Sequence, residues 1–350
     1  MDLSESICLR QTLSNKSIYK EETMNKTAIC LFSGGLDSVL AIRVMQEQGI
    51  ECIPLNFTSP FFGVRDTNLH ERYGFNTPIR NVDVTDEFLA MLRNPPHGYG
   101  SAMNPCVDCK ILIMSKAKSM LSELNASFIV SGEVLGQRPM SQQRDSMHVI
   151  ARDAGIEDIL LRPLSAHLLE PTLPEREGVV DRSKLLSFSG RGRKPQMELA
   201  AHFGIDTYEQ PAGGCILTEP QFITRIQDYL DNNKNEDIIA LRLLRLGRHY
   251  RIGENKIVVG RNDRENKQNM TMAQSGDIII SPKVCMGPTT IIHNCAGQHI
   301  LNDIIEMAAQ ITLCYTDCDT DQCEFLIGDD KVITVHRLPR EAFAMYRLNK

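Results

Sequence analysis

A glycine loop near the start of the chain has the residue types that hold a nucleotide phosphate. The loop SGGLDS, residues 33–38, follows the apolar run TAICLF and precedes VLAIRVMQEQG, whose apolar spacing and terminal Gly49 are typical of a helix and its C-cap. The backbone N–H groups of adjacent glycines and of a helix N-terminus can bind phosphate oxygens, and Asp37 can hold a bridging Mg²⁺. No GxxxxGKS motif is present, which excludes a Walker-type loop. Alternatively, the loop has only a structural role, as a tight turn followed by an N-terminal helix cap, and binds no phosphate.

Three cysteines are candidates for sulfur, redox or metal chemistry. Cys106 and Cys109 form a CxxC pair in NPCVDCK, at the expected start of a helix, where backbone donors lower the pKa of a thiol. Such a pair suits redox exchange, zinc binding or iron–sulfur ligation. A structural zinc needs two further ligands, and the nearest histidine, His97, has no partner at finger-like spacing. Cys215 ends the glycine turn PAGGC, where a lone cysteine is ordinarily a small apolar residue.

Three more cysteines lie close together near the C-terminus. Cys314, Cys318 and Cys323 belong to CYTDCDTDQC and form no CxxC pair. The acidic residues around them are expected to raise the pKa of their thiols. We interpret these cysteines as incidental, with metal binding as the alternative.

The elements around the loop and the CxxC pair predict an α/β domain. ECIPLNF follows the first helix as a second strand-like run, which indicates a βαβ unit with a parallel sheet, and the alternation continues through CKILIMSKAKSMLSEL, ASFIVSGE and MELAAHFGI. After about Asn235, short strand-like runs and one amphipathic helix, ILNDIIEMAAQIT, predict a second, smaller α+β domain. We place the linker in DYLDNNKNED. The expected boundaries are 1–24 for an N-terminal extension, 25–235 for the α/β domain and 236–350 for the second domain.

Composition limits the class of protein. The 350 residues include 42% apolar and 23% charged side chains, as in an ordinary soluble globular chain of about two domains. No apolar run approaches the roughly 18 to 20 residues that cross a bilayer. The N-terminal segment lacks the apolar core of a secretory signal, so we expect a cytoplasmic protein. A reducing cytoplasm keeps thiols free, and the eleven cysteines are therefore not expected to form a disulfide scaffold.

The motifs SGGLDS, NPCVDCK and PAGGC, in this order, resemble those of the PP-loop ATP pyrophosphatases that thiolate tRNA, the 2-thiouridine and 4-thiouridine synthases of the MnmA and ThiI type. The resemblance covers about residues 26–225 and implies a parallel-sheet fold of the adenine nucleotide alpha hydrolase type, also called HUP. It implies that ATP, with Mg²⁺ on Asp37, adenylates a uridine oxygen that sulfur then replaces. The glycine motif after ASFIV is similar to one that lines the nucleotide site of the family. The ATP-binding residues implied are Ser33, Gly34, Gly35, Asp37, Ser38 and Gly132.

The same resemblance implies roles for the cysteines. Family members of one type use two cysteines, one carrying a persulfide and one resolving it, whereas members of another type hold a 4Fe-4S cluster with three. Cys106, Cys109 and Cys215 match the three-cysteine type, because the two-cysteine type has another residue at one CxxC position. The resemblance implies that they ligate three irons, leave the fourth iron open to a hydrosulfide, and act in catalysis with Asp37. A persulfide on Cys106 or Cys215 is the alternative, and either route needs a sulfur donor protein or inorganic sulfide.

Two basic segments offer contacts to an RNA backbone, in a chain of net charge −6. Residues 176–194 hold six basic and two acidic side chains, and residues 242–267 hold eight and three. Within the second segment, RLGRHYRI and VVGRNDREN are similar to the NFACT-R domain, which implies contact with RNA. The candidate RNA-binding residues are Arg191, Arg193 and Lys194 in the first segment, and Arg248, Arg261, Asn262 and Asn266 in the second. Alternatively, these residues form turns and solvated surfaces that do not bind RNA.

Together these observations predict an enzyme, an ATP-dependent tRNA uridine sulfurtransferase whose C-terminal domain binds RNA. The alternative function keeps the nucleotide loop in a ligase or amidotransferase that acts on a small molecule, with structural or zinc-binding cysteines. A non-catalytic RNA-binding factor would have a vestigial nucleotide loop, and the intact Asp37 and Ser38 argue against it.

Overall fold

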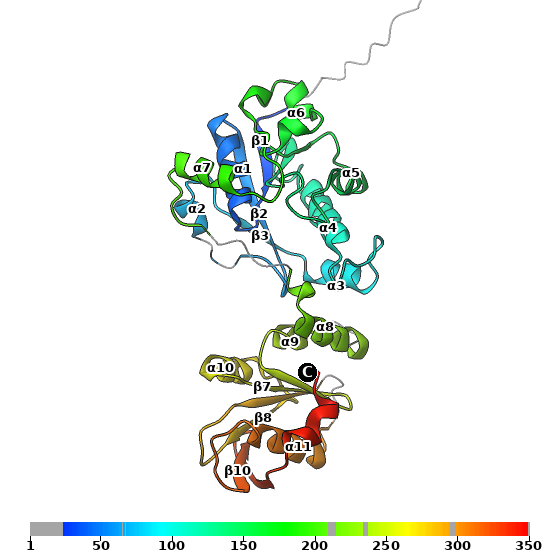
Figure 1. Cartoon of the computed structure of the whole chain (residues 1–350), viewed down its shortest axis with the longest axis vertical. Coiled ribbons are helices and arrows are strands. Elements are labelled where there is room, and N and C mark those ends of the chain that lie inside the picture. Colours follow the sequence, from blue (N-terminus) through cyan, green and yellow to red (C-terminus); the bar gives the residue numbers. More distant parts are fainter. Residues whose placement is uncertain are drawn as a thin grey trace, which may run out of the picture.

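The computed structural model describes residues 24–64, 66, 68–208, 215–233, 237–294 and 299–348. Figure 1 shows two domains, with the helices α8 (Pro220–Asn232) and α9 (Ile238–Leu243) between them. The predicted N-terminal extension, apart from Met24, and the four residues of the turn PAGG lie outside the described residues. None of the described helices has the length and apolar content needed to span a bilayer.

A five-stranded parallel sheet forms the centre of the N-terminal domain. The strand order is β3-β2-β1-β4-β5, and each neighbouring pair is parallel, which confirms the predicted α/β class. Because β1 lies between β2 and β4, the loops that leave β1 and β4 border a crevice at the topological switch point of the sheet. The strands are β1 (Thr27–Leu31), β2 (Glu51–Thr58), β3 (Arg80–Asp83), β4 (Phe128–Ser131) and β5 (Leu160–Leu161).

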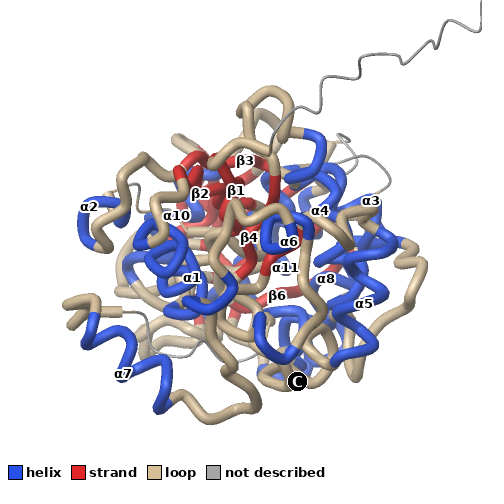
Figure 2. The backbone as a smooth tube through the Cα atoms, turned by 90° about the horizontal axis from the view of Figure 1, so that it is seen from above, coloured by secondary structure: helices blue, strands red, loops and turns tan. Residues whose placement is uncertain are grey.

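Helices cover both faces of this sheet (Figures 1 and 2). Ala28 and Cys30 of β1 face a core shared with α1 and α7, whereas the intervening Ile29 faces a core shared with α4 and α5. Burial on both faces explains why β1 and β4 in the middle of the sheet are mostly apolar along their length rather than alternating. The helices are α1 (Leu36–Glu47), α2 (Leu69–Arg72), α3 (Thr85–Arg93), α4 (Cys106–Ser119), α5 (Arg144–Asp153), α6 (Leu173–Arg176) and α7 (Lys194–His202), with 3-10 turns at Ala166–Leu168, Arg182–Lys184 and Ile216–Thr218.

A six-stranded antiparallel sheet of order β11-β10-β8-β9-β7-β6 forms the C-terminal domain, which confirms the predicted α+β class. The predicted amphipathic helix, α11, packs on one face, and α9 and α10 pack on the other. The elements are β6 (Arg248–Ile252), β7 (Asn255–Val259), α10 (Asp263–Met272), β8 (Ile278–Pro282), β9 (Thr290–Asn294), α11 (Asn302–Leu313), β10 (Gln322–Ile327), β11 (Lys331–His336) and a 3-10 helix at Arg340–Tyr346.

Helix α10 was not predicted from the sequence. Its residues, DRENKQNMTM, are mostly polar and lack the apolar spacing that reveals a helix. The side chain of Asn262 caps its start by accepting a hydrogen bond from Glu265 N at 3.0 Å. The buried Asn269 side chain donates to the carbonyls of Val258 and Thr289. Contacts with the sheet therefore hold α10 in place where local periodicity gives no signal.

The apolar side of α8 packs against the N-terminal domain. Phe222 and Tyr229 share a buried cluster with Phe61 and Phe88. The Arg225 side chain, in contrast, points to the C-terminal domain and donates to the carbonyls of Leu244 and Gly247 at 2.8 and 3.2 Å. This helix therefore contacts both domains.

Asp228 of α8 binds two cations of the C-terminal sheet. Its carboxylate accepts hydrogen bonds from Arg251 at 2.8 and 2.9 Å and from Lys256 at 2.5 Å. Burial alone would raise the pKa of Asp228, but the bonds to Arg251 and Lys256 outweigh burial and lower it. The carboxylate is thus charged in the folded protein and pairs with a lysine that is only 2% exposed.

We predict that Asp228→Ala lowers the free energy of unfolding by about 3 kcal/mol, because it removes the carboxylate that lies 2.5 Å from the ammonium group of the buried Lys256. The folded pKa of Asp228 is depressed, so its stabilisation is present above the pKa of an unfolded aspartate and is lost as the pH falls through the folded value. Urea unfolding near neutral pH and in acid measures both effects. Lys267→Ala, which removes an exposed ion pair with Asp263, is the control and should change stability little. Equal losses for the two variants would contradict the role of Asp228.

Candidate active site

The glycine loop lies where β1 ends and α1 begins. Gly34 has a φ of +79°, and a Cβ at this position would lie 2.5 Å from the side chain of Val64, so only glycine fits. Gly35 is extended, and Ser38 Oγ donates to its carbonyl at 2.7 Å. In the described structure no side chain caps the first amides of α1. These amides remain available to an anion, as the sequence predicted for this loop.

The loop after β4 touches the loop after β1 at Gly132. A Cβ on Gly132 would lie 2.6 Å from the backbone of Asp37 and 2.6 Å from the amide nitrogen of Ser38. A larger residue would push the two loops apart, because the contact is with backbone that cannot rotate away. The two predicted nucleotide-binding segments, far apart in the sequence, are therefore adjacent in the fold.

A pocket of about 380 Å³ connects the glycine loop to the cysteines. Its volume is in the range of small-molecule sites, roughly 300 to 1,000 Å³. Gly34 is part of the same loop but does not line the pocket, whereas the other predicted catalytic and nucleotide-binding residues do. They are Ser33, Gly35, Asp37, Ser38, Cys106, Cys109, Gly132 and Cys215.

The side chain of Asp37 is suited to bind a cation. Its Oδ2 accepts a hydrogen bond from Gln137 Nε2 at 3.0 Å. Its Oδ1 is buried and has no hydrogen-bond partner among the described residues. A buried carboxylate oxygen without a donor is costly, and Mg²⁺ prefers such hard oxygen ligands. The residues present therefore fit a magnesium ion beside the phosphate loop.

A buried ion network beside the pocket was missed by the sequence analysis. Glu133, 2% exposed, lies 3.0 Å from Arg162 Nε and 3.3 Å from Lys110 Nζ. Burial alone would raise the pKa of Glu133, but the two cations outweigh burial and lower it. Two residues of this network lie beside predicted site residues in the sequence, because Lys110 ends the motif NPCVDCK and Glu133 follows Gly132. Their pairing depends on the fold and has no local pattern.

Cys106 and Cys109 lie in the first turn of α4, as predicted, and Cys106 Sγ receives a hydrogen bond from Asn104 Nδ2 at 3.1 Å. The expected lowering of thiol pKa at this helix start is wrong for Cys109, because burial raises its pKa to about 12. Burial also raises the pKa of Cys215. These two thiols are therefore weak nucleophiles by themselves. Metal ligation would still ionise them, since a coordinated thiol loses its proton.

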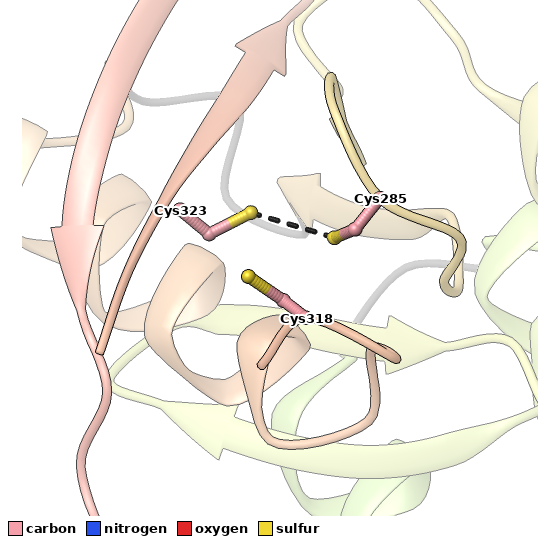
Figure 3. A group of neighbouring side chains, drawn as sticks. All are labelled: Cys285, Cys318 and Cys323. Atoms are coloured by element: carbon pink, nitrogen blue, oxygen red, sulfur yellow. Dashed lines mark hydrogen bonds between the residues drawn. The ribbon is translucent and has the colours of Figure 1, made fainter. Parts of the chain in front are cut away.

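The three pocket cysteines do not converge on the position of a single small ion. Among the described residues, the group with three ligand atoms all within 4.8 Å of one another is Cys285, Cys318 and Cys323 (Figure 3). A cubane cluster binds each thiolate to a different iron, so its ligands stand farther apart than those of one ion. Three separated thiols in one lining thus suit a cluster better than a lone zinc ion.

The interpretation of the C-terminal cysteines needs correction. Cys318 and Cys323 gather with Cys285, a residue 38 positions before Cys323 that no spacing rule could connect to them. Hydrogen bonding with the side chain and backbone of Thr320 lowers the pKa of Cys318 to about 7, so the prediction that nearby acids raise it is wrong for this thiol. Cys314 lies outside this group, and burial raises its pKa.

The predicted RNA contacts of the N-terminal domain are accessible. Arg191 and Lys194 are exposed and Arg193 is half-buried. Lys194 lies 3.9 Å from Glu198, a loose surface pair. These side chains can therefore approach a phosphate backbone.

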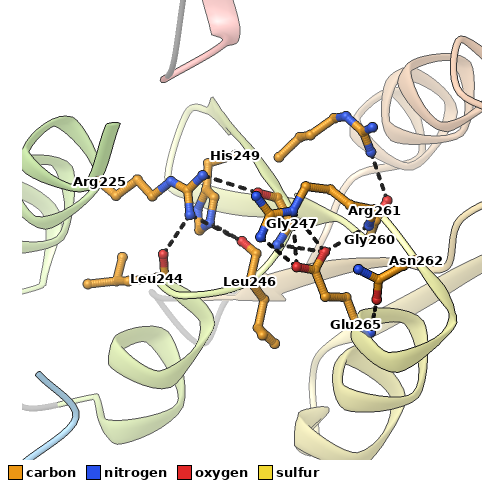
Figure 4. A network of polar contacts seen from close by, with 10 residues as sticks. Arg225, Leu244, Leu246, Gly247, His249, Gly260, Arg261, Asn262 and Glu265 are labelled. Carbon is orange, nitrogen blue, oxygen red and sulfur yellow. Dashed lines mark hydrogen bonds and ion pairs between the residues drawn. The ribbon is translucent and has the colours of Figure 1, made fainter. Parts of the chain in front are cut away.

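Arg248 and Arg261 instead have partners inside the C-terminal domain. Arg248 lies over the Tyr315 ring at 4.3 Å and donates to Gly260 O at 2.9 Å. Arg261 Nη2 lies 2.6 Å from Glu265 Oε1 (Figure 4). Two further candidates have structural contacts as well, since Asn262 caps α10 and the Asn266 side chain accepts from Thr289 N. A hollow of about 900 Å³ between the domains is lined by three other cations of this segment, Arg242, Arg245 and Arg264.

Comparisons with known proteins match the two domains separately. Residues 23–167 match the family model described as thiamine biosynthesis protein (ThiI), and residues 247–347 match the NFACT protein RNA binding domain. These matches confirm the resemblance of both regions to the families that the motifs indicated.

Three curated proteins are similar to parts of the chain. A probable tRNA sulfurtransferase of Thermococcus kodakarensis is 24% identical over 178 residues, 49% of this chain and 43% of that protein. A tRNA sulfurtransferase of Marinobacter nauticus is 28% identical over 149 residues, 40% of this chain and 29% of that protein. A 7-cyano-7-deazaguanine synthase of Sulfurovum sp. is 44% identical over 45 residues, 13% of this chain and 19% of that protein. The chain therefore spans less than half the length of each relative.

We predict that Gly132→Ala weakens the binding of MgATP by at least about tenfold, because its Cβ would displace the Asp37 and Ser38 backbone that begins α1. Isothermal titration calorimetry with a non-hydrolysable ATP analogue measures the affinity. Gly192→Ala is the matched control, since a Cβ there meets no atom within 4 Å. Unchanged affinity in a folded Gly132→Ala protein would show that the nucleotide does not use this loop.

Proposed function

We propose that this protein is an ATP-dependent tRNA sulfurtransferase. Its N-terminal part matches the ThiI model, and its C-terminal part matches an RNA-binding domain. The observation that carries the proposal is the single pocket lined by both the glycine loop and the three cysteines. Activation adenylates the oxygen of the same carbonyl group whose carbon the sulfur then attacks, so the residues for both steps have to reach one place. The two similar tRNA sulfurtransferases support this reading.

The first step is the activation of a uridine oxygen. A carbonyl oxygen of the base attacks the α-phosphorus of ATP, and pyrophosphate leaves. The amides at the start of α1 would bind phosphate oxygens, and Asp37 Oδ1 would hold a magnesium ion, which would supply positive charge to the leaving pyrophosphate. Lys110 and Arg138, which also line the pocket, add positive charge near the departing pyrophosphate.

The second step is the delivery of sulfur. Hydrosulfide attacks the activated carbon, the carbon–sulfur bond forms, and AMP leaves with the former oxygen. Cys106, Cys109 and Cys215 would hold a 4Fe-4S cluster, which would supply an iron to bind the hydrosulfide. The high pKa values of Cys109 and Cys215 support this assignment over their use as free nucleophiles. A persulfide on Cys106 or Cys215 remains the alternative. Inorganic sulfide can supply the hydrosulfide of the cluster route, whereas the persulfide route needs a donor protein that transfers sulfur already at the persulfide level.

The tRNA binds across both domains in this proposal. Arg191, Arg193 and Lys194 supply contacts to phosphates from the N-terminal domain. Arg242 and Arg264 supply contacts from the hollow between the domains, more directly than the internally paired Arg248 and Arg261. A tRNA substrate places the protein in the cytoplasm.

A second candidate function is a PP-loop ligase or amidotransferase acting on a small molecule. The observation that favours it is the match of 45 residues to a 7-cyano-7-deazaguanine synthase. In that case the cysteines are structural or bind zinc, and the basic residues form an ordinary solvated surface.

We predict that the anaerobically purified protein, given ATP, Mg²⁺, sulfide and tRNA, forms a thiolated uridine that mass spectrometry of the digested nucleosides detects. Cys106→Ala, Cys109→Ala and Cys215→Ala should each lower the yield by on the order of 100-fold or more, because each removes one sulfur ligand. Cys314→Ala, outside both cysteine groups, is the control. ATP turnover that needs a small molecule and ignores tRNA would favour the second candidate.

We predict that the same preparation absorbs broadly near about 400 nm and contains iron and acid-labile sulfide. All three signals should be lost in each of the Cys106, Cys109 and Cys215 variants and kept in Cys314→Ala. A colourless protein that thiolates tRNA with a persulfide donor, but not with sulfide, would replace the cluster with the persulfide route. A colourless and inactive protein, after careful anaerobic reconstitution, would contradict the proposal.

A further inference from the structure

Three cysteines of the C-terminal domain meet at one point, far from the pocket cysteines in the sequence. Cys285 lies in the connection from β8 to β9, Cys318 lies in the connection from α11 to β10, and Cys323 lies on β10. Their sulfur atoms all lie within 4.8 Å of one another, and those of Cys285 and Cys323 are 3.5 Å apart. Figure 3 shows the three side chains pointing toward a common centre from separate segments.

We propose that Cys285, Cys318 and Cys323 bind a zinc ion. Tetrahedral zinc at about 2.3 Å from each thiolate holds its sulfur ligands about 3.8 Å apart, which agrees with the compact spacing of this group. Thiolates select zinc over hard cations such as magnesium and calcium. The spacing is too tight for a cubane cluster, whose thiolates bind different irons. This site is independent of the proposed sulfurtransferase activity.

The two loops that carry Cys285 and Cys318 are fastened together by the protein itself. Asp317 N donates to Met286 O at 2.9 Å. Gly287 packs so closely on Thr316 that a Cβ would lie 2.6 Å from its methyl group. These contacts position two ligands before any ion binds, which lowers the entropic cost of binding.

Groups next to Cys318 fix the direction of its sulfur. The Thr320 hydroxyl lies 3.2 Å from Cys318 Sγ. Arg337 donates to the carbonyls of Cys318 and Leu313 at 2.5 and 3.2 Å, which anchors the backbone that carries the sulfur. Such surrounding hydrogen bonds are what orients the ligands of a metal site.

The fourth coordination position faces solvent. Among the described residues, no fourth cysteine, histidine or carboxylate joins the group. Cys285 and Cys318 are partly exposed, so water can complete the tetrahedron. The ion would join the β8–β9 connection, the α11–β10 connection and β10, which otherwise meet only through weaker contacts.

Metal analysis of the full-length protein tests this site. We expect the wild type, purified under reducing conditions and dialysed against zinc-free buffer, to retain one zinc per chain by inductively coupled plasma mass spectrometry. Cys285→Ser and Cys318→Ser should lose it, whereas Cys314→Ser should keep it. The triple variant Cys106→Ala/Cys109→Ala/Cys215→Ala should also keep its zinc, which separates this site from the pocket. Circular dichroism confirms that each variant is folded.

Cobalt provides a second readout that does not depend on activity. Co²⁺ exchanged into the site should give the intense visible bands of a tetrahedral thiolate complex in the wild type, in Cys314→Ser and in the triple pocket variant, but not in Cys285→Ser or Cys318→Ser. A wild type without zinc after reconstitution would overturn the proposal. Zinc retained by Cys318→Ser, or a Cys285–Cys323 disulfide found by mass spectrometry under reducing conditions, would overturn it as well.

Discussion

The arrangement of the pocket depends on one backbone contact, that of Gly132 with the first turn of α1. The contact exists because β1 and β4 are neighbours in a parallel sheet, so the loops that follow them leave from the same edge. The next residue after this contact, Glu133, pairs with Lys110 on α4. Lys110 in turn directly follows Cys109. This short series of contacts connects the glycine loop to the cysteines of α4.

The features that the sequence predicted are those whose signals are local. The SGGLDS loop, the CxxC pair and the alternation of strands and helices all lie within short windows, and all of them appear in the structure. The features it missed depend on residues that only the fold brings together. Helix α10 is mostly polar, and the side chain of Asn269 holds it to the sheet by donating to the carbonyls of Val258 and Thr289. The group of Cys285, Cys318 and Cys323 comes from three segments with no common motif.

The same distinction between local signals and contacts made by the fold applies to the charged residues and to the pKa values. A count of arginines by segment could not reveal that Arg248 lies on Tyr315 or that Arg261 pairs with Glu265, although both facts limit what these side chains offer to RNA. A rule about helix starts could not anticipate that burial raises the pKa of Cys109. In each case the local rule is sound, and the environment supplied by distant parts of the chain outweighs it.

The contacts of helix α8, rather than a pattern in the sequence, determine where the two domains can be separated. A fragment that begins at residue 236 would lack Asp228 and Arg225, so Lys256 would lose the Asp228 carboxylate, and the carbonyls of Leu244, Leu246 and Gly247 would lose the hydrogen bonds from Arg225. A fragment that begins at Pro220 keeps those bonds but exposes Phe222 and Tyr229 to water. The C-terminal domain can therefore be transplanted onto another enzyme only if the recipient offers an apolar surface for α8. Gene fusion and recombination are subject to the same condition, so the helix and the surface that receives it are expected to be inherited together.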